Sequence, residues 1–364
     1  MKIKPPFVPW LLVAILLVFS AGLFASPDLQ RQRNQPQPQK GTPIYIPNEV
    51  KTVMLQGMPE RQARLDIPFT VTHNIFLPAQ SGFHTVFFLK IKNAELDYHP
   101  AVAEKKEAKN ESNPQETQAQ PSSESQLQAT FNVFLMFNIL EAGQTKTLRE
   151  VYIPCNIMVP QGALDPEKED YYTFGYPLAA GNYLLAVAIT SLDLKKIGLQ
   201  YYEFSLPDPA SFTDTMETTP IFFVKSMERI DAPEMRPTLH KDYFTYSVLK
   251  IFPNVERIFA VGENLDIFFF ILGAQPAAEQ KYNIETNYEV KQNDELAIRW
   301  APGTYDSPLI SQPLPLQQTV IIKKGEEQRQ ETRDLPAGKY VLGIQIQDKV
   351  SGKTLSKTVD FEVR

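Results

Sequence analysis

The chain contains the segment Leu335-Pro336-Ala337-Gly338-Lys339-Tyr340-Val341-Leu342-Gly343-Ile344-Gln345-Ile346, and it also contains an earlier counterpart, Leu178-Ala179-Ala180-Gly181-Asn182-Tyr183-Leu184-Leu185-Ala186-Val187-Ala188-Ile189. Each position of one copy lies 157 residues from its equivalent in the other, since 335 − 178 = 157. The offset continues without a gap, so that Phe204 corresponds to Phe361. Two related units therefore follow one another along the chain.

Each copy consists of a turn, a glycine that can adopt positive φ, and a tyrosine that opens a strand. This order is typical of the corner of an immunoglobulin-like sandwich, where a tyrosine hydroxyl bonds back to the backbone a few residues upstream. We therefore expect structural tyrosine corners at Tyr183 and Tyr340. The predicted fold class is all-β, with two tandem immunoglobulin-like antiparallel β-sandwiches after an N-terminal signal segment.

Residues 1–25 have the plan of a secretory signal. Lys2 and Lys4 precede an apolar run from Trp10 to Phe19, and small residues follow up to Ala25. An uncleaved N-terminal anchor is the alternative, and in that case the membrane would be contacted through this segment. Residues 26–44, rich in Gln and Pro, are predicted to form a disordered linker.

The remaining chain is predicted to form a sandwich over 45–207, a linker over 208–240 and a second sandwich over 241–364. Residues 99–126 are polar and are predicted to be a disordered insert in the first sandwich. The repeat supports this prediction of an insert. Val86 corresponds to Ile267 at an offset of 181, whereas the tyrosine segments correspond at an offset of 157. The first unit is therefore 181 − 157 = 24 residues longer between these two points.

The composition excludes several classes of partner and chemistry. The net charge is −6 and no stripe of Lys and Arg alternates with aromatic residues, so nucleic acid is not expected as a partner. Cys155 is the single cysteine and lies in an apolar run, which favours a buried, inert thiol over a nucleophile and rules out a disulfide within the chain.

No catalytic or metal-binding motif emerges from the sequence. The four histidines, His73, His84, His99 and His240, have no metal-ligand spacing, although His73 and His84 could meet on adjacent strands. The acidic residues between Asp165 and Asp170 lack the glycine and the spacing of a calcium loop. We expect no catalytic residues, no metal ion and no cofactor, and the chain is predicted not to be an enzyme.

Three apolar residues are candidates for contact with a partner. Phe252, Ile258 and Phe259 lie in a stretch that reads as a loop before the strand at 265–272. They either fill the end of the second sandwich or form an exposed contact surface.

The segments 225–230, 259–269, 335–340 and 348–353 resemble accessory β-sandwich regions, immunoglobulin-like or fibronectin-like, of exported bacterial proteins. Such regions occur beside GWxTD domains or von Willebrand A-type domains. Neither the GWxTD sequence nor the D-x-S-x-S metal-site motif is present here, so the functions of those domains are not implied.

The function expected from the sequence is that of a non-catalytic exported protein, periplasmic or at the cell surface, whose loops and edges bind an unidentified protein or glycan at the cell envelope. Two alternatives remain open. One is a hydrolase acting on envelope material or polysaccharide, and the other is a structural spacer.

Overall fold

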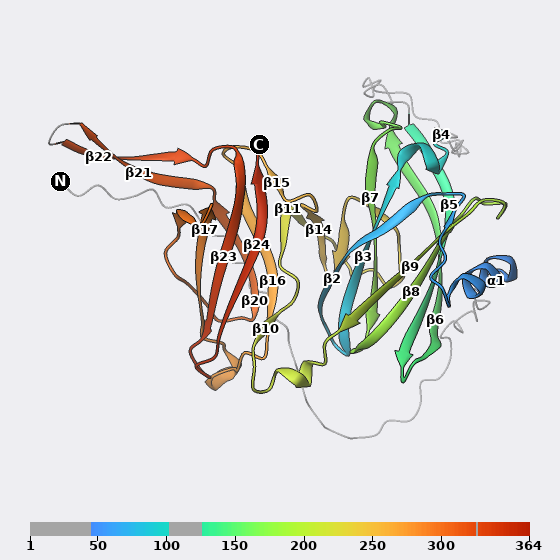
Figure 1. The fold of residues 1–364 in the computed structure, drawn as a ribbon, viewed down its shortest axis with the longest axis horizontal. Helices are drawn as coiled ribbons and strands as arrows, with labels where there is room; N and C mark the ends of the chain where they lie inside the picture. The colour runs from blue at the N-terminus through green and yellow to red at the C-terminus, as the bar shows by residue number, and fades with distance from the viewer. Residues whose placement is uncertain (1–44, 102–125, 325–326) are drawn as a thin grey trace, which may run out of the picture. The chain divides into compact units, whose positions relative to one another are not determined.

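The computed structural model describes residues 45–101, 126–324 and 327–364, which are mostly β-strands in several sheets (Figure 1). The predicted signal segment, the whole of the predicted linker 26–44, and residues 102–125 of the predicted insert lie outside the described residues. At the two ends of that insert, His99 and Pro100 pair with Gln128 and Leu127, so both ends belong to strands. Within the described ranges, no helix is long and apolar enough to cross a membrane.

Two sheets form a sandwich in the N-terminal half. The first sheet has the order β1-β9-β8-β5-β4, and β6 pairs with the other edge of β5. The strands of this sheet are β1 (Arg64–Leu65), β9 (Ile197–Leu206), β8 (Gly181–Thr190), β5 (Gln126–Glu141), β4 (His99–Pro100) and β6 (Gln144–Pro160). The second has the order β12-β7-β3-β2, with β12 (His240–Lys241), β7 (Glu169–Leu178), β3 (Gly82–Lys92) and β2 (Phe69–Ala79). Short 3-10 turns lie at η1 (Asn93–Leu96) and η2 (Gln161–Ala163).

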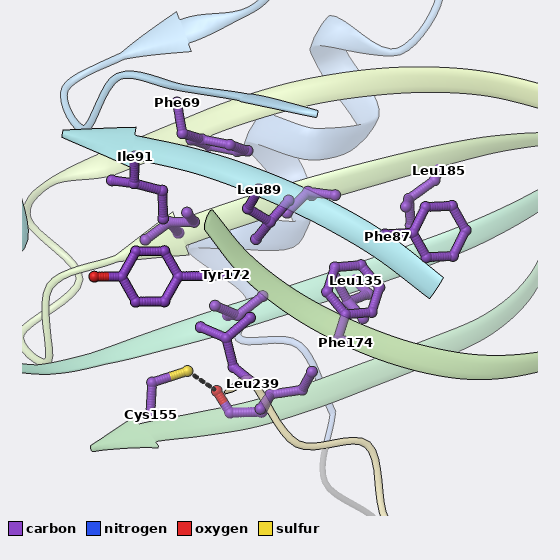
Figure 2. Packing of buried hydrophobic residues seen from close by; sticks show 14 of the residues in the cluster. Phe69, Phe87, Leu89, Ile91, Leu135, Cys155, Tyr172, Phe174, Leu185 and Leu239 are labelled. Atoms are coloured by element: carbon purple, nitrogen blue, oxygen red, sulfur yellow. Dashed lines mark hydrogen bonds between the residues drawn. The ribbon is translucent and has the colours of Figure 1, made fainter. Parts of the chain in front are cut away.

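Large apolar side chains from both sheets fill the space between them (Figure 2). Phe87 of β3 stacks on Phe174 of β7 with ring centroids 5.1 Å apart, and Leu135 and Leu185 approach from the facing sheet. Cys155 lies in the same core, where its Sγ donates to the Ile153 carbonyl and burial raises the pKa of its thiol. The prediction of a buried thiol is therefore confirmed.

A helix that the sequence reading missed, α1 (Asn48–Gly57), covers the outer face of the first sheet (Figure 1). Val50 and Met54 of the helix pack in one cluster with Leu184 and Ala186 of β8. Because β8 has this helix on one face and the sandwich core on the other, its residues from Tyr183 to Thr190 are all buried.

The C-terminal half contains a second pair of sheets around a separate core. One sheet has the order β10-β16-β11-β14-β13 with β20 also on β16, where the bounds are β10 (Glu217–Thr218), β16 (Asn264–Leu272), β11 (Phe222–Arg229), β14 (Leu249–Pro253), β13 (Phe244–Tyr246) and β20 (Leu309–Pro315). The other has the order β15-β24-β23-β17-β18 with β19 also on β17, where the bounds are β15 (Ile258–Phe259), β24 (Thr354–Val363), β23 (Gly338–Asp348), β17 (Ile284–Gln292), β18 (Glu295–Arg299) and β19 (Gly303–Tyr305).

Two further features complete the C-terminal half. β21 (Gln317–Lys324) and β22 (Glu327–Asp334) pair as a separate two-stranded ribbon that extends away from the sheets (Figure 1). The 3-10 turns η3 (Pro209–Phe212) and η4 (Ala278–Gln280) lie in connections. Among the described strands β15 and β24 pair in parallel, whereas the other pairs are antiparallel.

The predicted linker 208–240 is not a bare connection. β11 lies inside it and pairs with β16 and β14, because Phe222, Phe223 and Val224 bury their side chains. β11 therefore lies before residue 241, where the second sandwich was predicted to start. The outer face of β11 and β16 also packs against the N-terminal half, where Phe222 and Phe268 join Val86 and Phe88 in one apolar cluster.

Candidate functional site

The two repeated tyrosines make equivalent hydrogen bonds. The Tyr183 hydroxyl donates to the Ala179 carbonyl at 3.0 Å, and the Tyr340 hydroxyl donates to the Pro336 carbonyl at 2.8 Å. Both rings are buried, and each stacks on the phenylalanine that follows it by 21 residues. These hydrogen bonds connect each tyrosine to the turn that precedes its strand.

The register of β2 and β3 separates His73 from His84. His84 lies opposite Leu77, whereas His73 lies opposite Phe88, so that the two positions are offset by four residues, or roughly 13 Å along the strand. The side chain of His73 lies outside the described residues. The backbone geometry therefore does not bring these histidines together as a pair of metal ligands.

The ring of His84 is held close to the backbone of a neighbouring strand. A Cβ atom at Gly175 would lie 2.3 Å from its Nε2, so the imidazole occupies space that only glycine leaves free. Its Nε2 is buried and has no partner among the described residues. Burial lowers the pKa of His84, which keeps the ring neutral near pH 7.

The acidic stretch from Asp165 to Asp170 serves an ion-pair network. Asp170 is almost fully buried, and its carboxylate accepts from Lys241 at 2.5 Å, Lys168 at 2.9 Å and Asn93 at 2.9 Å. Burial would raise the pKa of Asp170, but these hydrogen bonds outweigh burial and lower it. No group of three or more His, Cys, Asp or Glu among the described residues is arranged to hold a metal ion.

The three predicted contact residues have different environments. Phe259 is 3% exposed and packs edge-on against Phe223 and Phe361 in the second core. Phe252 is half-buried, and the Lys250 ammonium lies 4.7 Å from its ring centroid. Ile258 is also half-buried and lies beside a cleft.

The cleft, which we call the β11–β16 cleft, has a volume of about 690 Å³. β11 pairs with β16 only as far as Val224 opposite Asp266, and an irregularity between Val224 and Ser226 then shifts its register with β14. The lining comes from four segments of the C-terminal half: Val224 and Lys225; Asn254, Ile258, Phe259 and Ala260; Glu263, Asn264 and Asp266; and Arg364. Its volume lies within the range of roughly 300–1,000 Å³ of small-ligand sites.

Asp266 is the chemically unusual residue of this cleft. Its Oδ1 is buried and has no hydrogen-bond partner among the described residues. Burial raises the pKa of Asp266, with no lysine or arginine acting against it. A buried polar atom without a partner costs about 1–3 kcal/mol. A donor that enters the cleft would reach this carboxylate through its other oxygen, Oδ2, because Oδ1 is buried.

The other polar residues of the cleft are differently engaged. The Arg364 guanidinium pairs with Glu362 at 2.8 Å, and Glu263 accepts from the Ala260 backbone N–H at 2.7 Å. The Asn254 amide donates to the Ile258 carbonyl at 2.7 Å. Lys225 is exposed at the rim. Asp266 is thus the lining residue with the strongest need for a donor.

Sequence reasoning missed Asp266, although the surrounding residues contain a signal. Along β16, Leu265, Ile267 and Phe269 point into the core, and Asp266, Phe268 and Phe270 share the opposite face. A single carboxylate in an otherwise aromatic stripe is atypical of a solvent-facing strand. Of the three candidate residues, Ile258 and Phe259 line this cleft and Phe252 does not.

Comparison with known proteins gives no family. No protein-family model matches the chain, and no curated protein matches it. Among solved structures, the chain is similar to the crystal structure of a Salmonella alpha-2-macroglobulin mutant at 10% identity and a TM-score of 0.17. That match covers 84% of this chain and 17% of the other. At this TM-score the likeness carries no argument about fold or function.

Proposed function

We propose that this chain is a non-catalytic exported binding protein, in which two tandem immunoglobulin-like sandwiches present the β11–β16 cleft to a protein or glycan at the cell envelope. The two separate cores and the equivalent tyrosine bonds support the tandem arrangement. The sequence of residues 1–25 supports export to the periplasm or the cell surface.

The main support for this proposal is the cleft itself, whose walls are well packed and whose Asp266 carboxylate has no donor among the described residues. Buried residues fix the strands that form the cleft walls: Leu265 and Ile267 flank Asp266 in β16, and Val224 of β11 is itself buried. A preformed wall reduces the ordering cost of binding, because its side chains are already fixed before the partner arrives.

The test is affinity capture of envelope components with the full chain. Ala260→Trp would fill the cleft from an exposed lining position without changing the charge. Val350→Trp adds the same ring at an exposed position outside the cleft and is the matched control. We expect the wild type and Val350→Trp to retain the same component and Ala260→Trp to lose it.

Two results would contradict the proposal. Equal capture by Ala260→Trp and wild type would show that the cleft is not the binding surface. Turnover of a glycan or peptide panel by the purified wild type, abolished by substituting a carboxylate, would show that the protein is an enzyme.

A further inference from the structure

The chemistry of the β11–β16 cleft narrows the choice of partner. Asp266 lines the open cleft, and its carboxylate lacks a donor among the described residues; Oδ1 is buried, so an incoming group reaches the carboxylate through Oδ2. An ionised carboxylate gains more from a cationic donor than from a neutral one, because a charge-assisted hydrogen bond is about twice as strong. The attraction also increases where water is excluded.

A sugar fits the same cleft less well. Sugar rings commonly stack on exposed aromatic faces, and the aromatic residue in the cleft lining, Phe259, is buried in the core. A hydroxyl donor would also leave the negative charge of Asp266 uncompensated. The cleft therefore favours a positively charged group over a neutral carbohydrate.

We propose that the cleft receives a lysine or arginine side chain, presented to Asp266 by an extended segment of a protein partner. This inference rests on the proposed function, because it names the partner chemistry of the same cleft. Lys225 and Arg364 also line the cleft, and their positive charges affect which basic segments can enter it. They repel a run of basic residues, so the cleft selects a single basic side chain with neutral or acidic neighbours.

The experiment uses two small probes, N-acetyl-arginine amide and N-acetyl-citrulline amide, which have nearly the same shape and differ in charge. Binding of each probe to the full chain is measured by saturation-transfer NMR at pH 7. Asp266→Asn removes the charge and keeps the shape of the side chain. Asp214→Asn makes the same substitution at an exposed position outside the cleft and is the matched control.

We expect the arginine probe to bind at least tenfold more tightly than the citrulline probe. Asp266→Asn should weaken arginine binding at least tenfold, and Asp214→Asn should leave it unchanged. Equal affinity for both probes, or arginine binding unaffected by Asp266→Asn, would overturn the inference.

If Asp266→Asn does not fold, the wild type provides the same test through pH. Arginine binding should weaken as pH falls below 7 and the Asp266 carboxyl, whose pKa is raised by burial, becomes protonated, and constant affinity down to the lowest pH at which the protein stays folded would overturn the inference. The capture assay separates this inference from the proposed function. Capture that depends on the cleft but persists in Asp266→Asn contradicts the inference alone. Asp266-dependent binding of the arginine probe without any captured component contradicts the proposed function alone.

Discussion

Truncation of Phe259 separates the two interpretations of the stretch around residues 252–259. The side chain is 3% exposed, and its ring centroid lies 5.3 Å from that of Phe223 and 5.8 Å from that of Phe361. Replacing a buried phenylalanine by alanine typically costs about 3–5 kcal/mol, because apolar contacts are lost and a cavity remains. That loss is a large part of a total stability of roughly 5–15 kcal/mol.

Phe252→Ala is the matched comparison, since it makes the same truncation in the same stretch. Phe252 is half-buried and contacts Tyr243 and the Lys250 ammonium, so its loss should cost about 1 kcal/mol. Chemical denaturation of both variants, followed by far-UV circular dichroism, measures the difference. We expect a lower unfolding midpoint for Phe259→Ala than for Phe252→Ala.

The reasoning would be refuted if Phe259→Ala were no less stable than Phe252→Ala. Loss of partner capture at unchanged stability would instead identify Phe259 as a contact residue and would require its ring to leave the core in the bound state.

Three further predictions follow from buried groups. Tyr183→Phe and Tyr340→Phe should each lower the free energy of unfolding by about 0.5–1.5 kcal/mol in denaturation, and a loss at only one of the two sites would contradict their equivalence. Asp170→Ala should cost about 1–3 kcal/mol, because the buried Asn93 amide loses an acceptor and the half-buried Lys241 loses its ion pair, whereas Asp193→Ala at an exposed ion pair should have a much smaller effect. Burial lowers the pKa of His84 in the folded protein, so the contribution of His84 to stability is present above its unfolded pKa of about 6.5 and is lost as pH falls. The free energy of unfolding should therefore fall more between pH 7 and pH 5 in the wild type than in His84→Gln. An equal fall in both proteins would exclude this role of His84.

Much of the strand content was predictable because the signal is local. The predicted strand at 265–272 corresponds to β16, and the strands predicted at Tyr183 and Tyr340 correspond to β8 and β23, each with apolar residues that are buried. The offset of 157 also places Tyr183 and Tyr340 at equivalent turns, where each hydroxyl bonds to a carbonyl four residues upstream.

Other strands depend on partners that are distant in the chain, and one of them, β22, has no apolar pattern at all. β22, with the sequence Glu-Gln-Arg-Gln-Glu-Thr-Arg-Asp, contains no apolar residue and forms only because β21 pairs with it. β7 follows an acidic loop, and its burial depends on β3 at one edge and on β12, from a distant part of the chain, at the other. Pairing between distant segments, and not local propensity, determines these elements.

The repeat itself contained the signal for the missed helix α1. On the face of the strand opposite the core, the first copy has Leu184, Ala186 and Ala188, whereas the second has Val341, Gly343 and Gln345. An apolar outer face needs a cover, and α1 supplies it in the first copy, where Leu184 is fully buried. In the second copy the equivalent Val341 is 37% exposed.

The candidate site could not be derived from the sequence of one strand alone. Asp266 shares a face with Phe268, and Phe268 is buried because the N-terminal half packs against it. The carboxylate then lies where β11 stops pairing with β16, a place fixed by the register irregularity near Val224. Each cause involves segments far apart in the chain, so a carboxylate without a donor becomes recognisable only when sheet register and packing are both known.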